Sequence, residues 1–145
     1  MDNTLVITKK YEESNFSGVI KTNENIYYNN TLVPIRALWD TGSSISVISS
    51  DLAKKLNLNP IGLSYLNGTN SFNKSNIYEI VLLLAEEQRI TLHVTESHQL
   101  KDNGLDFLIG LDVICLGDFA ISTYDGTVCF SFRYPSQGFI DFNKQ

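Results

Sequence analysis

One stretch of the sequence, Ala37-Leu38-Trp39-Asp40-Thr41-Gly42-Ser43, places a carboxylate directly after an apolar run. An apolar strand would hold Asp40 rigidly at the edge of a core, where its carboxylate can take up or release a proton. Gly42 permits a tight turn, and the hydroxyls of Thr41 and Ser43 can hydrogen-bond to backbone or to the carboxylate. Because all four residue types are also common in surface turns, the tripeptide alone is a weak indication of catalysis.

Two further segments fit the same kind of site. Seventy residues on (110 minus 40), an apolar run again ends in glycine and leads into a short helical pattern, in Asp106-Phe107-Leu108-Ile109-Gly110-Leu111-Asp112. Between the two lies the segment 61–84, whose polar, glycine-containing centre (67–76) is flanked by apolar residues. That pattern is typical of an exposed hairpin.

In this order the three segments resemble the retropepsin-like aspartic protease family, over about residues 31–132 of the chain. In that family an Asp-Thr-Gly loop is followed by a flap hairpin and then by an apolar-apolar-Gly segment with a short supporting helix. Residues 107–121 look specifically like the bacterial and phage-type members. The resemblance implies a peptide hydrolase, an aspartic-type endopeptidase, built on a closed β-barrel, with an extended peptide as substrate and no cofactor. It assigns catalysis to Asp40, Thr41 and Gly42, substrate contacts to Ser43, Val47, Gly68, Thr69 and Ile109, and support of the active-site loop to Leu108 and Gly110.

Aspartic protease chemistry needs two carboxylates that share a proton, and this sequence has one Asp-Thr-Gly. Asp125 precedes Gly and Thr in scrambled order and is better explained as a hairpin turn. Asp112 and Asp118 follow no comparable strand and are poor candidates for the second acid. We therefore expect a homodimer in which the two copies of Asp40 meet on a twofold axis. Residues 128–132 or the tail 139–142 are candidates for an intersubunit sheet.

The remaining pattern predicts an all-β fold with one or two short helices. The β-rich runs 77–84 and 89–95 are separated by polar residues, and the runs 119–124 and 127–132 by Asp-Gly; both pairs predict hairpins. A short helix is expected at 50–56, capped by Ser49 or Ser50, and a second at 111–116. Many short strands with turn signals favour a barrel or a sandwich.

Composition excludes several other classes. The formal net charge is -5 and the eleven Lys and Arg residues are scattered, which argues against nucleic-acid binding. His93 and His98 flank Glu96, but no zinc-ligand spacing accompanies them, so we expect no metal. Cys115 and Cys129 are expected to be small buried thiols, although a disulfide between them stays open. No serine-nucleophile elbow occurs in the sequence.

We expect one domain at 31–134, preceded by an N-terminal strand or extension (1–30) and followed by a C-terminal tail (135–145). The first residues of the sequence have no basic start with a long apolar run, as a signal peptide would have. The densest apolar run in the sequence is too short to cross a bilayer. The expectation is a cytoplasmic protein with no membrane partner. An alternative to the dimeric endopeptidase is a retropepsin-like domain with little or no activity that serves as a dimerisation or peptide-binding module. A third interpretation is an unrelated all-β binding domain in which the motif is chance.

Overall fold

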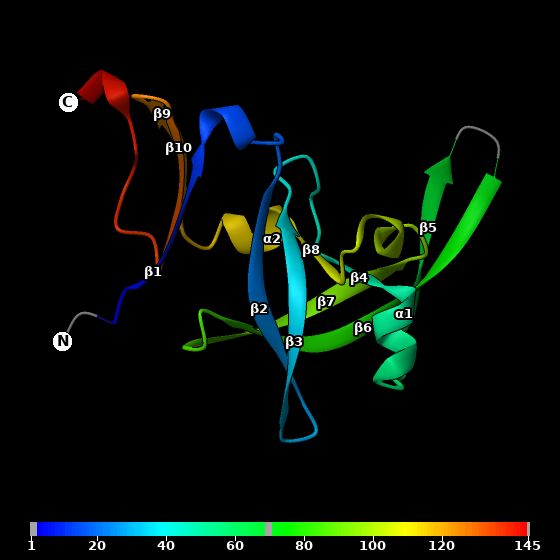
Figure 1. Cartoon of the computed structure of the whole chain (residues 1–145). Helices are drawn as coiled ribbons and strands as arrows, with labels where there is room; N and C mark the ends of the chain where they lie inside the picture. Colours follow the sequence, from blue (N-terminus) through cyan, green and yellow to red (C-terminus); the bar gives the residue numbers. More distant parts are fainter. Residues whose placement is uncertain (1–2, 69–70, 145) are drawn as a thin grey trace.

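The computed structural model describes residues 3–68 and 71–144, and strands dominate it (Figure 1). The strands are β1 (Leu5–Glu12), β2 (Ile20–Tyr28), β3 (Thr31–Trp39), β4 (Val47–Ser49), β5 (Gly62–Gly68), β6 (Ser71–Leu84), β7 (Gln88–Ser97), β8 (Phe107–Ile109), β9 (Asp118–Tyr124) and β10 (Thr127–Tyr134). The helices are α1 (Ser50–Lys55), α2 (Leu111–Ile114) and three 3-10 turns, η1 (Glu13–Asn15), η2 (Leu100–Asn103) and η3 (Phe142–Lys144).

Six of the strands close into a barrel. Their order is β2-β3-β8-β4-β7-β6, and the pairing of β2 with β6 returns the sheet to its first strand. Closure leaves these strands without a long free edge. The barrel has the all-β architecture that the turn-separated strand pattern predicts, and the β6–β7 hairpin predicted from residues 77–95 is confirmed.

Alternation of buried and exposed residues explains why these segments form half-buried strands. Along β2 the side chains of Ile20, Thr22, Glu24 and Ile26 are buried, and along β7 those of Ile90, Leu92 and Val94 are buried. Successive side chains of a strand point to opposite faces, so one face of each strand builds the interior of the barrel. Two of the buried positions on β2 are polar, which hydrophobic patterning alone does not explain.

A second sheet packs against one side of the barrel. It has the order β1-β10-β9, and Figure 1 shows both chain termini beside it. The β9–β10 hairpin turns at Asp125 (φ 50°) and Gly126 (φ 75°), as the Asp-Gly pair predicts. The two sheets meet at Trp39, whose ring centroid lies 4.9 Å from that of Phe132 and 5.1 Å from that of Phe130. The last residue of β3 is therefore held by aromatic packing just before Asp40.

Both predicted helices form, and the second is shorter than expected. Ser49 caps α1 by accepting the N–H of Leu52 at 3.1 Å, and Leu52 and Ala53 turn its apolar face inward. Helix α2 spans only Leu111–Ile114 and not 111–116. Beyond Ile114 the chain continues in tighter turns, in which the N–H of Leu116 donates to the carbonyl of Val113 at 2.9 Å and the N–H of Gly117 donates to that of Ile114 at 3.3 Å. Position 117 has no room for a side chain, because a Cβ atom there would be 2.2 Å from the carbonyl oxygen of Arg133.

One of the two candidates for an intersubunit sheet is wrong. Residues 128–132 belong to β10, which lies between β1 and β9, so both of its hydrogen-bonding edges are already occupied. The tail 139–142 forms no strand within the single chain and leads into η3, so its part in an intersubunit sheet stays a prediction. The free edges of this sheet are those of β1 and β9.

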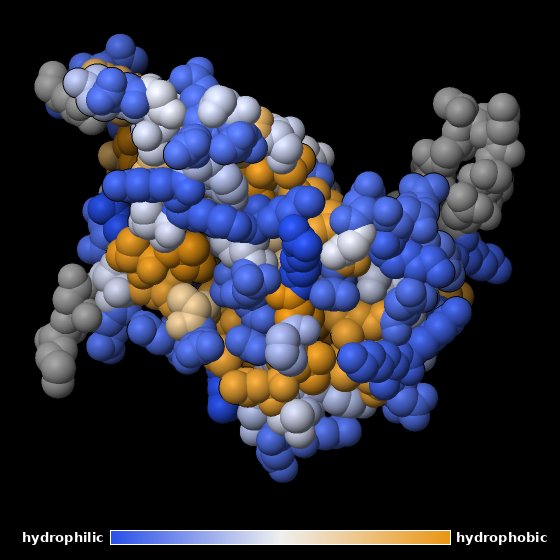
Figure 2. All heavy atoms as spheres, in the orientation of Figure 1, coloured by the Kyte–Doolittle hydropathy of each residue, from blue (hydrophilic) through white to orange (hydrophobic). Residues whose placement is uncertain are grey.

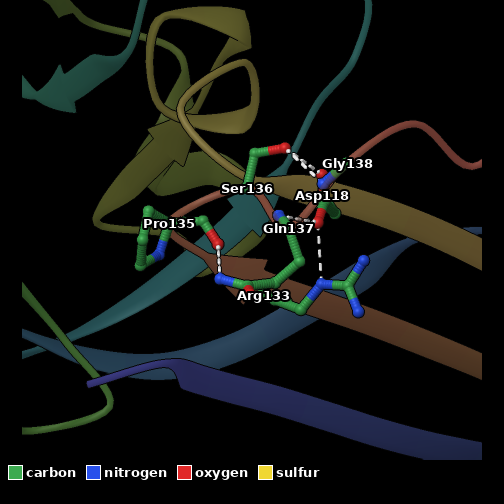
Figure 3. Close-up of polar contacts among 6 residues, drawn as sticks. All are labelled: Asp118, Arg133, Pro135, Ser136, Gln137 and Gly138. Atoms are coloured by element: carbon green, nitrogen blue, oxygen red, sulfur yellow. Dashed lines mark hydrogen bonds and ion pairs between the residues drawn. The ribbon is translucent and has the colours of Figure 1, made fainter. Parts of the chain in front are cut away.

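The tail is tied to the second sheet by one carboxylate, Asp118 (Figure 3). Asp118 accepts hydrogen bonds from Arg133 Nε at 2.7 Å, from the hydroxyl of Ser136 at 2.5 Å and from the N–H of Gln137 at 2.7 Å. These donors, with the backbone N–H of Gln137 first, lower the pKa of Asp118 to about 2. Asp118 is therefore a structural anchor of the tail.

Replacement of Asp118 is expected to change how the stability of the fold depends on pH in the acidic range. Because the folded-state pKa of Asp118 is lowered, its stabilising contribution is complete above the ordinary value of 3.8 and is lost as the pH falls towards about 2. Asp118→Asn should therefore lower the denaturation midpoint at neutral pH, and the difference from the parent should shrink steadily below pH 3.8 and disappear only as the pH falls through about 2. Urea melts across this range measure the effect; a difference that is constant with pH would contradict it.

Candidate active site

The loop after β3 turns back on itself at Asp40 through backbone bonds. The N–H of Asp40 donates to the carbonyl of Ile109 at 2.9 Å, and the N–H of Ser43 donates to the carbonyl of Asp40 at 3.3 Å. The Oδ1 atom of Asp40 accepts the N–H of Gly42 at 2.8 Å. The Asp40 side chain is half-buried, while Thr41 and Gly42 are exposed. Hydrogen bonds therefore hold the backbone and one carboxylate oxygen of Asp40, while the side chain remains partly accessible to solvent.

Gly110 supports this loop from the other segment because it has no side chain. A Cβ atom at this position would lie 2.5 Å from the carbonyl oxygen of Ile45 and 2.9 Å from that of Ser43. The next residue, Leu111, donates its N–H to the Ser43 carbonyl at 2.8 Å. The apolar-apolar-Gly segment therefore touches the Asp-Thr-Gly-Ser loop directly, as the resemblance implies.

Asp112 and Ser46 join the same contact, and sequence reasoning missed this role. Asp112 accepts the N–H of Ser46 at 2.9 Å and its hydroxyl at 2.7 Å, and the Ser46 hydroxyl accepts the N–H of Gly110 at 3.1 Å. Ser46 is fully buried. The only signal in the sequence was the acidic Asp112 in the first turn of a predicted helix. An acidic residue there indicates a favourable interaction with the helix N-terminus, and it does not predict a contact with Ser46. Asp112 locks α2 to the end of the active-site loop.

Loss of the hydrogen bonds between Asp112 and Ser46 is expected to lower the stability of the fold. Asp112→Ala leaves the buried N–H and hydroxyl of Ser46 without their acceptor and should lower the free energy of unfolding by about 2 kcal/mol. Asp51→Ala is a matched control, since Asp51 is exposed and only faces Lys101 at 3.7 Å. Equal denaturation midpoints for the two variants would contradict the assigned role.

Strand alternation distinguishes the two apolar residues before Gly110. Ile109 is completely buried and belongs to the core, whereas Leu108 is half-buried and lies opposite Val47 in the β4–β8 ladder and opposite Leu38 in the β3–β8 ladder. Directly opposed residues of a sheet point to the same face. Leu108 therefore shares the half-buried face of Val47, and Ile109 supports the loop from inside, the reverse of the roles expected from the resemblance.

The hairpin of β5 and β6 is the candidate flap. Its strands pair in register from Gly62–Ile77 to Gly68–Ser71. In Figure 1 the hairpin projects from the barrel on the side of the active-site loop. Gly68 ends β5, and Thr69 lies outside the described residues.

A groove of about 420 Å³ lies beside the active-site loop. Asp40 and Thr41 line it together with apolar side chains from three other parts of the fold: Phe16, Val19, Ile20, Leu38, Trp39, Phe119 and Ile121. Val19 and Ile121 are 38% and 50% exposed. Large apolar side chains therefore lie uncovered next to the catalytic motif.

The other candidate residues form no comparable site in the part of the chain that the structure describes. His98 accepts from or donates to the Ser50 hydroxyl at 2.8 Å, and His93 contacts Glu79 at 3.3 Å, on separate strands and loops. No group of three or more potential metal ligands occurs among the described residues. Cys115 and Cys129 are free thiols, and neither is buried as expected: Cys115 is exposed at the end of α2, and Cys129 is half-buried on β10. Among the described residues, no helix is long and apolar enough to cross a membrane.

The closed barrel and the supported Asp-Thr-Gly loop have the architecture of an acid protease, and the comparisons support that family and fold. An aspartyl protease family model matches residues 25–113, which is more than half of the chain. The chain belongs to this family, and its fold is that of the retropepsin-like aspartic proteases. No curated protein sequence matches the chain.

Three solved structures illustrate the shared fold. The first is a retropepsin-like aspartic protease from Rickettsia conorii, at 17% identity and a TM-score of 0.58, with 92% of this chain and 97% of that chain covered. The EIAV protease, solved with the inhibitor HBY-793, shows 16% identity and a TM-score of 0.50 over 70% and 89% of the two chains. The simian foamy virus protease shows 14% identity and 0.50 over 66% and 92%.

Proposed function

We propose that this protein is an aspartic endopeptidase that acts as a homodimer, with Asp40 of each subunit forming the catalytic pair. The observation that carries the proposal is the fixed position of Asp40, whose backbone is bonded to Ile109 and whose loop is pressed against Gly110. A carboxylate held in this way, with its outer face open, is preorganised for proton transfer.

The reaction needs one ionised and one protonated carboxyl group. The ionised Asp40 takes a proton from a water molecule, whose oxygen bonds to the scissile carbonyl carbon. The protonated Asp40 of the partner subunit donates its proton to the carbonyl oxygen. The C–N bond of the resulting gem-diol then breaks as one hydroxyl proton returns to a carboxylate and the amine nitrogen takes up the proton abstracted from water. Two carboxylates in contact resist double ionisation, which keeps one proton on the pair.

The groove beside Asp40 is the proposed seat of the second subunit. It combines Thr41 with the uncovered side chains of Val19 and Ile121, and Ile121 belongs to β9, an edge strand. Figure 2 shows apolar surface between η1 and the active-site loop. Apolar patches at an open sheet edge favour association with another chain, and a twofold arrangement brings both copies of Thr41 to the axis.

An extended peptide is the proposed substrate, bound between the active-site loop and the flap hairpin through main-chain hydrogen bonds. Val47 and Leu108 share one half-buried face near the loop and would favour apolar substrate side chains. The contacts to Gly42, Ser43 and the hairpin tip at Gly68 and Thr69 stay as proposals on the strength of the resemblance.

Digestion of a mixed peptide library tests the proposal. The purified protein should cleave peptides between about pH 4 and pH 6, with a specific activity that rises with enzyme concentration as dimers form. Mass spectrometry of the products reports the cleaved bonds. Saturable peptide binding without any cleavage would contradict the endopeptidase and indicate a binding module on the same fold.

A further inference from the structure

A buried acid, Glu96, lies near the end of the barrel strand β7 and has no place in the chemistry above. The residue is 6% exposed. It continues the alternation of buried side chains through Leu92 and Val94, so its carboxylate points into the barrel. The Oε2 atom accepts two hydrogen bonds, from Nδ2 of Asn76 at 3.1 Å and from the hydroxyl of Tyr78 at 3.3 Å. Acids are rarely buried unless such donors replace the lost hydration, and here both donors come from β6.

The two donors also contact each other, which closes a triangle of hydrogen bonds. Nδ2 of Asn76 donates to the hydroxyl oxygen of Tyr78 at 3.2 Å. Burial raises the pKa of Tyr78; the hydrogen bond from Asn76 opposes this rise, and the charge of Glu96 adds to it. The hydroxyl therefore keeps its proton and donates it to Glu96. A carboxylate that receives both bonds is the acceptor that holds the three side chains together.

This triangle lies where the candidate flap leaves the barrel (Figure 1). The β6–β7 ladder begins at Ile77, and Ile77 also pairs with β5 at the base of the β5–β6 ladder. Tyr78 pairs with β7 and so belongs to the barrel, whereas Asn76 pairs with Leu63 of β5 and belongs to the candidate flap. The bond from Asn76 to Glu96 therefore ties the candidate flap to the barrel one residue beyond the last backbone pair of β6 with β7.

On its other side, Glu96 borders the strand that follows the active-site loop. It lies opposite Ile48 in the parallel β4–β7 ladder. The preceding residue, Thr95, donates its N–H to the carbonyl of Ser46 at 3.4 Å, at the end of that loop. Ser46 is the residue that Asp112 holds. The acceptor of the Asn76 bond is therefore fixed to the same part of the barrel that carries the active-site loop.

We propose that Glu96 is a positioning residue for the candidate flap, which it holds at its base by accepting the hydrogen bond of Asn76. The part of this inference that concerns peptide binding rests on the proposed function; the hold on the hairpin does not. Glu96 is buried and acts through Asn76, without contact to a substrate. With the bond in place, the hairpin keeps one orientation relative to the loop of Asp40; without it, the hairpin pivots at Ile77.

Amide hydrogen exchange, followed residue by residue in NMR spectra, tests the hold on the hairpin. Asn76→Leu keeps the branched shape, removes the donor and leaves the bond between Tyr78 and Glu96. Amides at 62–68 and 71–76 should then exchange about tenfold faster, while those at 78–84 and 88–94 stay as in the parent. Glu79→Gln, on the exposed face of the same strand, is the control and should change neither group. Unchanged exchange in the hairpin, or an equal increase in both groups, would overturn the inference.

Two substitutions of the acid itself separate its role as acceptor from its volume. Glu96→Gln retains an oxygen that can accept both bonds and should keep the hairpin amides near the parent rates. Glu96→Met has similar length without that acceptor and should release them; equal rates in the two variants would refute the role of Glu96. If Glu96→Met does not fold, Tyr78→Phe takes its place: it leaves the bond from Asn76 intact and should keep the hairpin protected, so that release as large as in Asn76→Leu would contradict the inference.

The kinetic readout separates this inference from the proposed function. A hairpin that binds the peptide equally before and during the reaction affects KM and leaves kcat unchanged, so Asn76→Leu should raise KM about fivefold and change kcat by less than about twofold. A lower kcat at unchanged KM would contradict the part that concerns peptide binding. If the parent chain cleaves no peptide, the proposed function fails, and the exchange rates still decide whether Glu96 holds the hairpin.

Discussion

Asp40→Asn is expected to abolish peptide cleavage while leaving the fold intact. The asparagine side chain has nearly the same shape, and its carbonyl oxygen can still accept the N–H of Gly42 that Asp40 Oδ1 accepts at 2.8 Å. It cannot take a proton from water, so kcat should fall by about a thousandfold or more. Circular dichroism and a thermal melt check the fold, and initial rates on one cleaved peptide check the chemistry.

Asp125→Asn is the matched control for that substitution. Asp125 stands beside glycine and threonine as Asp40 does, but it occupies the left-handed position of the β9–β10 turn (φ 50°), which asparagine also adopts readily. Full activity is expected for this variant. Cleavage by Asp40→Asn at the rate of the Asp125→Asn protein would remove Asp40 from the mechanism.

Gly110→Ala is expected to have the second-largest effect. The added Cβ would lie 2.5 Å from the Ile45 carbonyl oxygen and 2.6 Å from its carbon, and both are backbone atoms that no rotamer change can move. The loop that carries Asp40 must therefore shift. We expect a loss of about 3 kcal/mol in the free energy of unfolding, and a fall in kcat of the protein that remains folded.

Gly62→Ala shows whether the effect is specific to this contact. At Gly62 the nearest atom to a new Cβ is Ile77 Cδ1 at 3.8 Å, which is ordinary van der Waals distance. Urea denaturation of the two variants measures the difference. If Gly110→Ala and Gly62→Ala unfold at the same urea concentration, the loop does not depend on the close approach at Gly110.

Local pattern was sufficient to predict most of the fold. The Asp-Gly pair predicted the β9–β10 turn, and the polar break at 86–88 predicted the β6–β7 turn, because turn residues act through their own backbone preferences. The length of α2 was not predictable in this way. The chain after α2 lies against the backbone of Arg133, 16 residues beyond Gly117 (133 minus 117), which leaves no room for a side chain at position 117.

In the candidate site, too, some residues could be predicted from the sequence and others could not. Asp40 and Gly110 stood out in the sequence because they belong to two short motifs of a known family, and the structure brings the two motifs into contact. Ser46 and Asp112, in contrast, gain their importance from hydrogen bonds that span 66 residues of sequence. Such roles depend on tertiary contacts that residue type and spacing do not encode.

The central claim is that each active site contains Asp40 from two subunits, and subunit mixing tests it most directly. Parent and Asp40→Asn subunits are exchanged at a fixed total concentration, and cleavage is measured against the parent fraction. The account predicts activity proportional to the square of that fraction, so that an equimolar mixture keeps about a quarter of the parent rate. A linear dependence, with about half the rate in the equimolar mixture, would show that one chain suffices and would contradict the paired site.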